Sequence, residues 1–104
     1  MEAAKKFVQI IAFETDRIDE MRTLALNTEK RFAGMENGPS YQVVLKDRNQ
    51  PDRYYEVLEF DSFDEAMRSR ENPGAREFAE SMAALCTRPP SFIECDIVEA
   101  SRPK

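Results

Sequence analysis

YYEVLEFDSFDEAMRSRENPGAREFAESM, residues 54–82, joins a strand, a capped helix, a proline break and a second amphipathic helix without a linker between them. An aromatic-rich alternating run ends at Phe60. Ser62 and Glu65 follow at the spacing of a capping box, in which the hydroxyl accepts a helix amide and the carboxylate reaches back. Pro73 interrupts the helix because proline lacks an amide hydrogen and disfavours helical geometry in the residue before it. The stretch predicts one strand and two consecutive helical pieces.

The sequence on either side supplies three more strands and another helix. Residues 7–14 are a nearly continuous apolar run typical of a strand. Thr15 or Asp16 then caps a helix that ends at Gly34, and its apolar stripe recurs at intervals of three and four residues: Ile18, Met21, Leu24, Ala25, Thr28 and Phe32. The polar segment 48–53 predicts a hairpin loop. The other predicted strands are residues 41–47, 54–60 and 91–99, and the second helical piece is 74–86.

This order, strand–helix–strand–strand–helix–strand, predicts a ferredoxin-like α+β fold (βαββαβ). Right-handed crossovers place the first and third strands in the centre of a four-stranded antiparallel sheet, with the helices on one face. At 104 residues, and with no internal repeat or low-complexity tract, the chain is predicted to form one domain, residues 1–104.

Charge and hydropathy exclude several classes of partner. The net charge is −5 and the basic residues are scattered among acids, so we expect no binding to nucleic acid. The apolar run at residues 7–13 is too short to span a bilayer, which predicts no membrane partner and a cytoplasmic location. Cys86 and Cys95 lie in apolar surroundings without metal or redox spacing, and we expect buried free thiols.

Strand parity indicates what lies on each side of the sheet. One face is uniformly apolar and is predicted to be the core: Val8, Ile10, Ala12, Tyr55, Val57, Ile93, Cys95 and Ile97. The other face is mixed: Gln9, Ile11, Phe13, Tyr54, Glu56, Leu58, Phe60, Phe92, Glu94, Asp96 and Val98. Its apolar members are too extensive to face water, which predicts a homodimer packed sheet against sheet. A monomer whose open face is tolerated, or covered by residues 100–104, is the alternative.

Four segments carry a family resemblance: FVQIIAFE (7–14), YYEVLEFDSFDEAM (54–67), ENPGAREFAESMAAL (71–85) and PSFIECDIVEA (90–100). Together they resemble the dimeric α/β-barrel proteins of the antibiotic biosynthesis monooxygenase type. The resemblance implies a homodimer with a pocket for a small apolar or aromatic ligand. In some members it implies oxygenation of a polycyclic phenolic substrate without a cofactor. Phe60 stands where many relatives have tryptophan, and a chain without histidine lacks the ligand of the haem-degrading members.

Oxygenation of this kind requires a base and an apolar cavity. Glu56 is the candidate base, and a carboxylate at the dimer interface, paired with arginine or solvated, is the alternative for this residue. Five residues are candidates for lining a ligand pocket, although ordinary packing explains them equally well: Gln9, Phe13, Tyr54, Phe60 and Met67. Glu94 and Asp96 are two acids on one strand and do not make a metal site, so neither metal nor cofactor is predicted.

Two functions are therefore open. The chain is either a cofactor-independent monooxygenase acting on an aromatic or polyketide-like metabolite, or a non-catalytic ligand-binding or interaction module of the same fold. The absence of histidine and tryptophan favours the module, whereas a pocket containing a carboxylate of perturbed pKa favours the enzyme.

Overall fold

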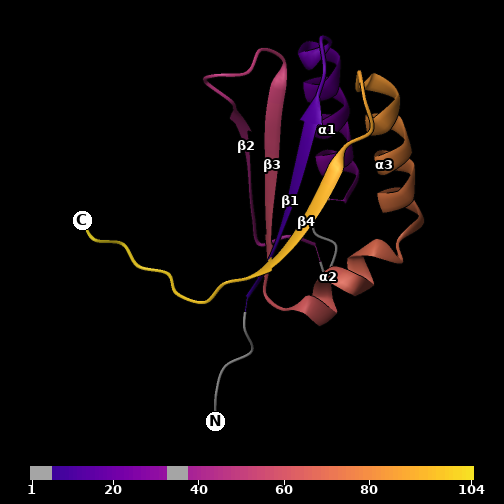
Figure 1. The fold of residues 1–104 in the computed structure, drawn as a ribbon. Coiled ribbons are helices and arrows are strands. Elements are labelled where there is room, and N and C mark those ends of the chain that lie inside the picture. The colour runs from indigo at the N-terminus through magenta and orange to yellow at the C-terminus, as the bar shows by residue number, and fades with distance from the viewer. Residues whose placement is uncertain (1–5, 33–37) are drawn as a thin grey trace.

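The computed structural model describes residues 6–32 and 38–104. Its four strands form an antiparallel sheet in the order β2-β3-β1-β4, and the helices lie on one face, which is the predicted ferredoxin-like arrangement (Figure 1). In chain order the elements are β1 (Phe7–Glu14), α1 (Ile18–Phe32), β2 (Tyr41–Lys46), β3 (Arg53–Phe60), α2 (Phe63–Arg70), α3 (Pro73–Leu85) and β4 (Ser91–Asp96). Within the described ranges, no helix combines the length and the apolar character needed to cross a membrane.

Local signals place the helix boundaries as expected. Ser62 is the N-cap of α2, and its Oγ accepts the amide hydrogen of Glu65 at 3.1 Å. Asn72 caps α3 by accepting the Gly74 amide at 2.8 Å, and Pro73 occupies the first helical turn, where a missing amide costs nothing. The last strand ends at Asp96, three residues earlier than predicted. The predicted helix stop at Gly34 lies outside the described residues.

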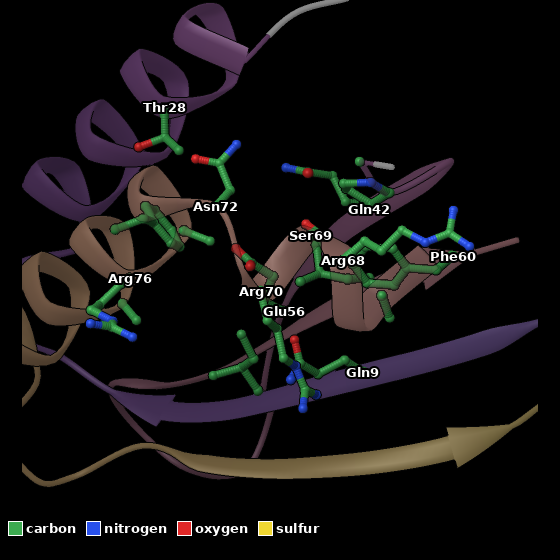
Figure 2. Close-up of a pocket in the computed structure, with 18 of the residues that line it drawn as sticks. Gln9, Thr28, Gln42, Glu56, Phe60, Arg68, Ser69, Arg70, Asn72 and Arg76 are labelled. Atoms are coloured by element: carbon green, nitrogen blue, oxygen red, sulfur yellow. The ribbon is translucent and has the colours of Figure 1, made fainter. Parts of the chain in front are cut away.

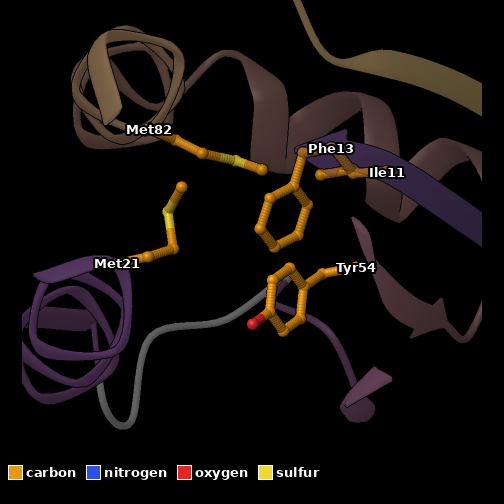
Figure 3. Close-up of a cluster of buried hydrophobic side chains, with 5 residues drawn as sticks. All are labelled: Ile11, Phe13, Met21, Tyr54 and Met82. Carbon is orange, nitrogen blue, oxygen red and sulfur yellow. The ribbon is translucent and has the colours of Figure 1, made fainter. Parts of the chain in front are cut away.

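Two hydrophobic clusters join the helices to the sheet. The larger one combines Ile11, Phe13 and Tyr54 of the sheet with Met21 of α1 and Met82 of α3 (Figure 3). The Phe13 and Tyr54 rings are stacked with centroids 5.6 Å apart, and the two methionines reach toward them from opposite helices. The second cluster lies at the other end of the sheet and contains Phe7, Phe60 and Ala66, with Met67 packed against it. These clusters hold the helices over the two ends of the sheet.

The prediction of which face is covered is wrong. The helices pack on the mixed face, where Ile11, Phe13 and Tyr54 are buried, and the uniformly apolar face is the open one. Parity identifies residues that share a face, but the crossovers decide which face receives the helices. The mixed face works as an interior because its large side chains form the two clusters, while Gln9 and Glu56 border a cleft between them.

The open face presents a regular grid of apolar side chains. Its central row crosses all four strands as Val43, Val57, Ile10 and Ile93, which the strand register places side by side. The flanking rows are Leu45, Tyr55, Ala12 and Ser91 on one side, and Tyr41, Glu59, Val8 and Cys95 on the other. Tyr41, Leu45 and Ile93 remain 46–59% exposed. The tail at 97–104 leads away from the sheet and leaves this face uncovered (Figure 1).

Candidate ligand-binding cleft

A cleft of about 1390 Å³ lies between the sheet and the helices. Its floor comes from β1, β3 and β4, and its other walls come from α1, α2, the α2–α3 junction, α3 and the start of β2. Figure 2 shows Gln9 and Glu56 on the sheet side, with Thr28 and Asn72 on the helix side. Because ligand pockets usually measure about 300–1,000 Å³, the cleft has room for a polycyclic molecule.

Glu56 is the buried charge of this cleft. It lies on β3 between Ile11 of β1 and Val44 of β2, and only 6% of its surface is exposed. Among the residues that the structure describes, none forms a hydrogen bond or ion pair with its carboxyl group. Burial raises the pKa of Glu56 because an ionised carboxylate loses its hydration there. This carboxyl group therefore holds its proton to a higher pH than an exposed glutamate.

Gln9 and Glu94 continue the polar part of the floor. They are paired across β1 and β4, and Gln9 is also the diagonal neighbour of Glu56 on the same face. Arg70 of α2 binds Glu94, with Nη2 and Oε1 2.6 Å apart, and its Nη1 approaches the sulfur of Met67 at 3.7 Å. Arg70 therefore pairs with Glu94 and not with Glu56.

The structure brings together only part of the predicted ligand site. Gln9, Glu56 and Phe60 all line the cleft. Phe13 instead borders a smaller cavity, and Tyr54 is stacked on Phe13 within the larger cluster. Met67 packs against the cluster of Phe7, Phe60 and Ala66.

Several polar residues of the cleft were not predicted from the sequence: Thr28, Gln42, Ser69 and Asn72. Asn72 carries the clearest signal, since it precedes the proline that breaks the helix and this break lies over the sheet. Its Oδ1 is used by the cap, so its Nδ2 group is the atom available to a ligand. Gln42 is on an edge strand and had no local signal of this kind.

A second cavity, of about 40 Å³, lies on the other side of Glu56. It lies between α1, α3 and the sheet and is partly open beside Val44, which is 48% exposed. Most of its lining is apolar: Phe13, Ile18, Met21, Ala25, Val44, Phe78 and Met82. Glu56 and Arg22 are its polar members. Glu56 therefore separates a large open cleft from a small apolar chamber.

Within residues 6–32 and 38–104, no three histidine, cysteine, aspartate or glutamate side chains gather in a way that could hold a metal ion. Cys86 and Cys95 are both free thiols. The Cys86 thiol donates to the Met82 carbonyl at 3.3 Å, and burial raises its pKa.

The strand order, the helices on one face and the cleft beneath them define a ferredoxin-like α+β protein with a ligand-sized cleft. No protein-family profile matches the sequence, and no curated protein sequence matches it significantly. Solved structures do match, and several of them are described as antibiotic biosynthesis monooxygenases. SnoaB from Streptomyces nogalater, a cofactor-independent oxygenase, has a TM-score of 0.78 at 19% identity, covering 97% of this chain and 100% of SnoaB.

Two further structures have the same fold. A proposed antibiotic biosynthesis monooxygenase from Bordetella bronchiseptica has a TM-score of 0.74 at 15% identity, covering 91% of this chain and 99% of that one. A second, from Nitrosomonas europaea, has a TM-score of 0.74 at 12% identity, covering 94% of each chain. Likeness at these identities establishes the fold that was predicted from the sequence.

Proposed function

We propose that this chain is a cofactor-independent monooxygenase that binds an aromatic or polyketide-like metabolite in the cleft and uses Glu56 as its base. The observation that carries the proposal is the Glu56 carboxyl group, 6% exposed and without a partner among the described residues, at the floor of a cleft of about 1390 Å³. The shared fold with SnoaB, a cofactor-independent oxygenase, supports it.

The chemistry needs little from the protein beyond a base and a water-poor site. Ionised Glu56 removes a proton from a CH₂ group made acidic by neighbouring phenol or carbonyl groups. The resulting carbanion gives electrons to O₂ and forms a peroxide, which loses water to leave a carbonyl group, so that CH₂ and O₂ become C=O and H₂O. A raised pKa makes Glu56 a stronger base once it is ionised, which suits proton removal from carbon.

The remaining parts of the cleft suit an aromatic ligand with polar substituents. Phe60, Leu58 and Phe92 offer apolar area to flat rings, whereas the Gln9 amide and the Asn72 Nδ2 group can orient a carbonyl or hydroxyl oxygen. Gln9 lies beside Glu56 on the floor, so a group bound to its amide is held near the base.

The active form in this proposal is a homodimer. Its interface is the open apolar face, with Val43, Val57, Ile10 and Ile93 in the central row. A second copy placed there covers apolar side chains without blocking the cleft, because the cleft lies on the helix side of the sheet.

Oxygen uptake with a panel of polyphenols and hydroxyquinones tests the proposal. We expect at least one compound to cause oxygen consumption by the wild-type protein. Glu56→Gln should lower the rate by about 10²–10⁴-fold, the usual contribution of a general base. Glu80→Gln, the same change at an exposed site on α3 outside the cleft, should leave the rate unchanged.

Two results would contradict parts of this proposal. Uptake that persists in Glu56→Gln removes Glu56 as the base. A ligand-dependent rise in melting temperature without any oxygen uptake identifies the non-catalytic binding module instead.

A further inference from the structure

We propose that the small chamber behind Glu56 is a binding site for dioxygen. This chamber, hereafter the apolar chamber, is the 40 Å³ cavity between α1, α3 and the sheet. The inference deepens the proposed function and rests on it for the fate of the oxygen, but the affinity of the chamber for a small apolar molecule is a separate property of its walls.

The size of the chamber selects its occupant. A cavity needs roughly 10–15 Å³ to hold one water molecule, and a dry apolar cavity of about 150 Å³ binds benzene or xenon. At about 40 Å³ the chamber is too small for an aromatic ring, so the metabolite remains in the larger cleft. A diatomic molecule or a single large atom fits.

The lining selects against water. A buried water usually makes about three hydrogen bonds. Here Glu56 and Arg22 are the only polar side chains among the lining residues, and the rest of the wall consists of the Phe13 and Phe78 rings, the Met21 and Met82 thioethers, and aliphatic side chains. Figure 3 shows Met21 and Met82 approaching each other beside Phe13. Polarizable sulfur and aromatic carbon favour a small apolar guest through dispersion contacts.

The chamber lies next to the proposed base, where bound oxygen could react. Glu56 borders both the chamber and the cleft, and Ala25 and Phe78 also line both. Oxygen held there is next to the carboxyl group that creates the carbanion, on the side away from the bulk of the metabolite. The two reactants therefore reach Glu56 from separate sides and do not compete for one volume.

Xenon is the probe, because it is apolar and needs no catalysis. Protein carrying ¹³C-labelled methionine methyl groups is placed under xenon pressure and observed by NMR. We expect the Met21 and Met82 methyl signals to shift as xenon is added. Met67 lines neither cavity, so its signal should stay in place and serve as the internal control.

Two filling variants and one enlarging variant sharpen the test. Val44→Phe and Ala25→Leu add volume at the chamber wall from opposite sides, and each should abolish the xenon shift of Met82. Met21→Ala should increase it, since the chamber grows. Val98→Phe, the same change at a tail residue that is 92% exposed, should leave the shift unchanged.

The inference is overturned if xenon leaves Met21 and Met82 unmoved, if all three methyl signals move equally, or if the shift survives in both filling variants. Xenon binding without oxygen uptake from any compound would contradict the proposed monooxygenase activity and leave only an apolar site for a small molecule. Oxygen uptake without xenon binding would support the monooxygenase activity and contradict the dioxygen site in the apolar chamber. With both positive, Val44→Phe should raise the KM for oxygen, while the KM for the metabolite stays the same.

Discussion

Two carboxyl groups attached to the same sheet differ in what surrounds them. Glu56 is buried with no hydrogen-bond donor from residues 6–32 or 38–104, and burial raises its pKa. Asp47 accepts the Tyr55 hydroxyl at 2.7 Å and the amides of Asn49 and Gln50, and these hydrogen bonds, the one from Tyr55 above all, lower its pKa. The first environment favours the protonated form and the second favours the charge. Asp47 is thus a hydrogen-bond acceptor that stabilises the hairpin. Glu56 is the carboxyl group whose surroundings make it a stronger base when it is ionised.

The raised pKa of Glu56 predicts how stability changes with pH. Below its ordinary value of 4.5, the side chain is protonated in both the folded and the unfolded states and costs nothing. As pH rises toward the folded-state pKa, the unfolded chain gains stability by ionising, so the protein loses stability. Glu56→Gln removes that loss. At pH 8 we expect the variant to be more stable than wild type, by about 1.4 kcal/mol for each pH unit by which burial raises the pKa of Glu56.

Urea unfolding of wild type and Glu56→Gln, measured from pH 4 to pH 8 at one fixed protein concentration, checks this expectation. The difference between the two should be smallest at pH 4. Glu80→Gln, at an exposed position, is the matched control for the loss of one carboxylate. Equal stability of Glu56→Gln and wild type at pH 8 would mean that the carboxyl group has found a partner.

The position of single cleft residues could be predicted in part from the alternation of side chains along the strands. Parity alone placed Gln9, Glu56 and Phe60 on one face, and the structure has all three at the cleft. It could not separate Phe13 from them, because the depth of a residue under a helix depends on how the helices cross the sheet. The hairpin loop at residues 48–53 was predicted, but its backbone conformation was not, since Asp52 adopts φ of 62°, a conformation for which glycine is the usual signal.

At the scale of elements, the boundaries follow from caps and breaks that neighbouring residues create. Ser62 and Pro73 fix the starts of α2 and α3, and both were readable from the sequence. The covered face of the sheet was not, because it is decided by crossovers between distant strands. The apolar alternation of β4 has the same appearance whether a helix or a second copy lies against it.

The Ser62 cap makes a testable contribution to stability. Its Oγ accepts the amide hydrogen of Glu65 at 3.1 Å. This amide lies in the first turn of α2, where no backbone carbonyl of the helix can accept it. Ser62→Ala should lower the free energy of unfolding by about 0.5–2 kcal/mol, as loss of an N-cap hydroxyl usually does. Ser81→Ala, at an exposed position within α3, is the control and should be neutral or slightly stabilising, because alanine favours the helix interior. Equal effects of the two changes on the free energy of unfolding in urea would show that the Ser62 cap does not stabilise the protein.

At the scale of the whole molecule, the two faces of the sheet differ in what they carry. The helix face holds the cleft and the apolar chamber, and the open face holds the grid centred on Ile10 and Val57. Although Glu59 and Ser91 lie in its flanking rows, so large an apolar surface on a solvent-facing sheet is costly, since large exposed apolar patches usually mark a contact surface. The expectation of a dimer thus survives the exchange of faces, and the surface proposed for it is more apolar than the mixed face would have been.

A charge placed in the middle of this grid tests the dimer. Ile10→Lys puts an ammonium group in the central row, where a partner copy would have to bury it among apolar side chains, and we expect the mass in sedimentation to fall from that of two chains to that of one. Leu26→Lys makes a similar change at an exposed site on α1, away from the open face, and should leave the mass at two chains. The cleft remains complete in one copy, so monomeric Ile10→Lys should still bind a cleft ligand found for the wild type. A wild-type protein that sediments as one chain at every concentration would remove the dimer, and loss of ligand binding in a folded Ile10→Lys monomer would mean that the partner contributes to the cleft.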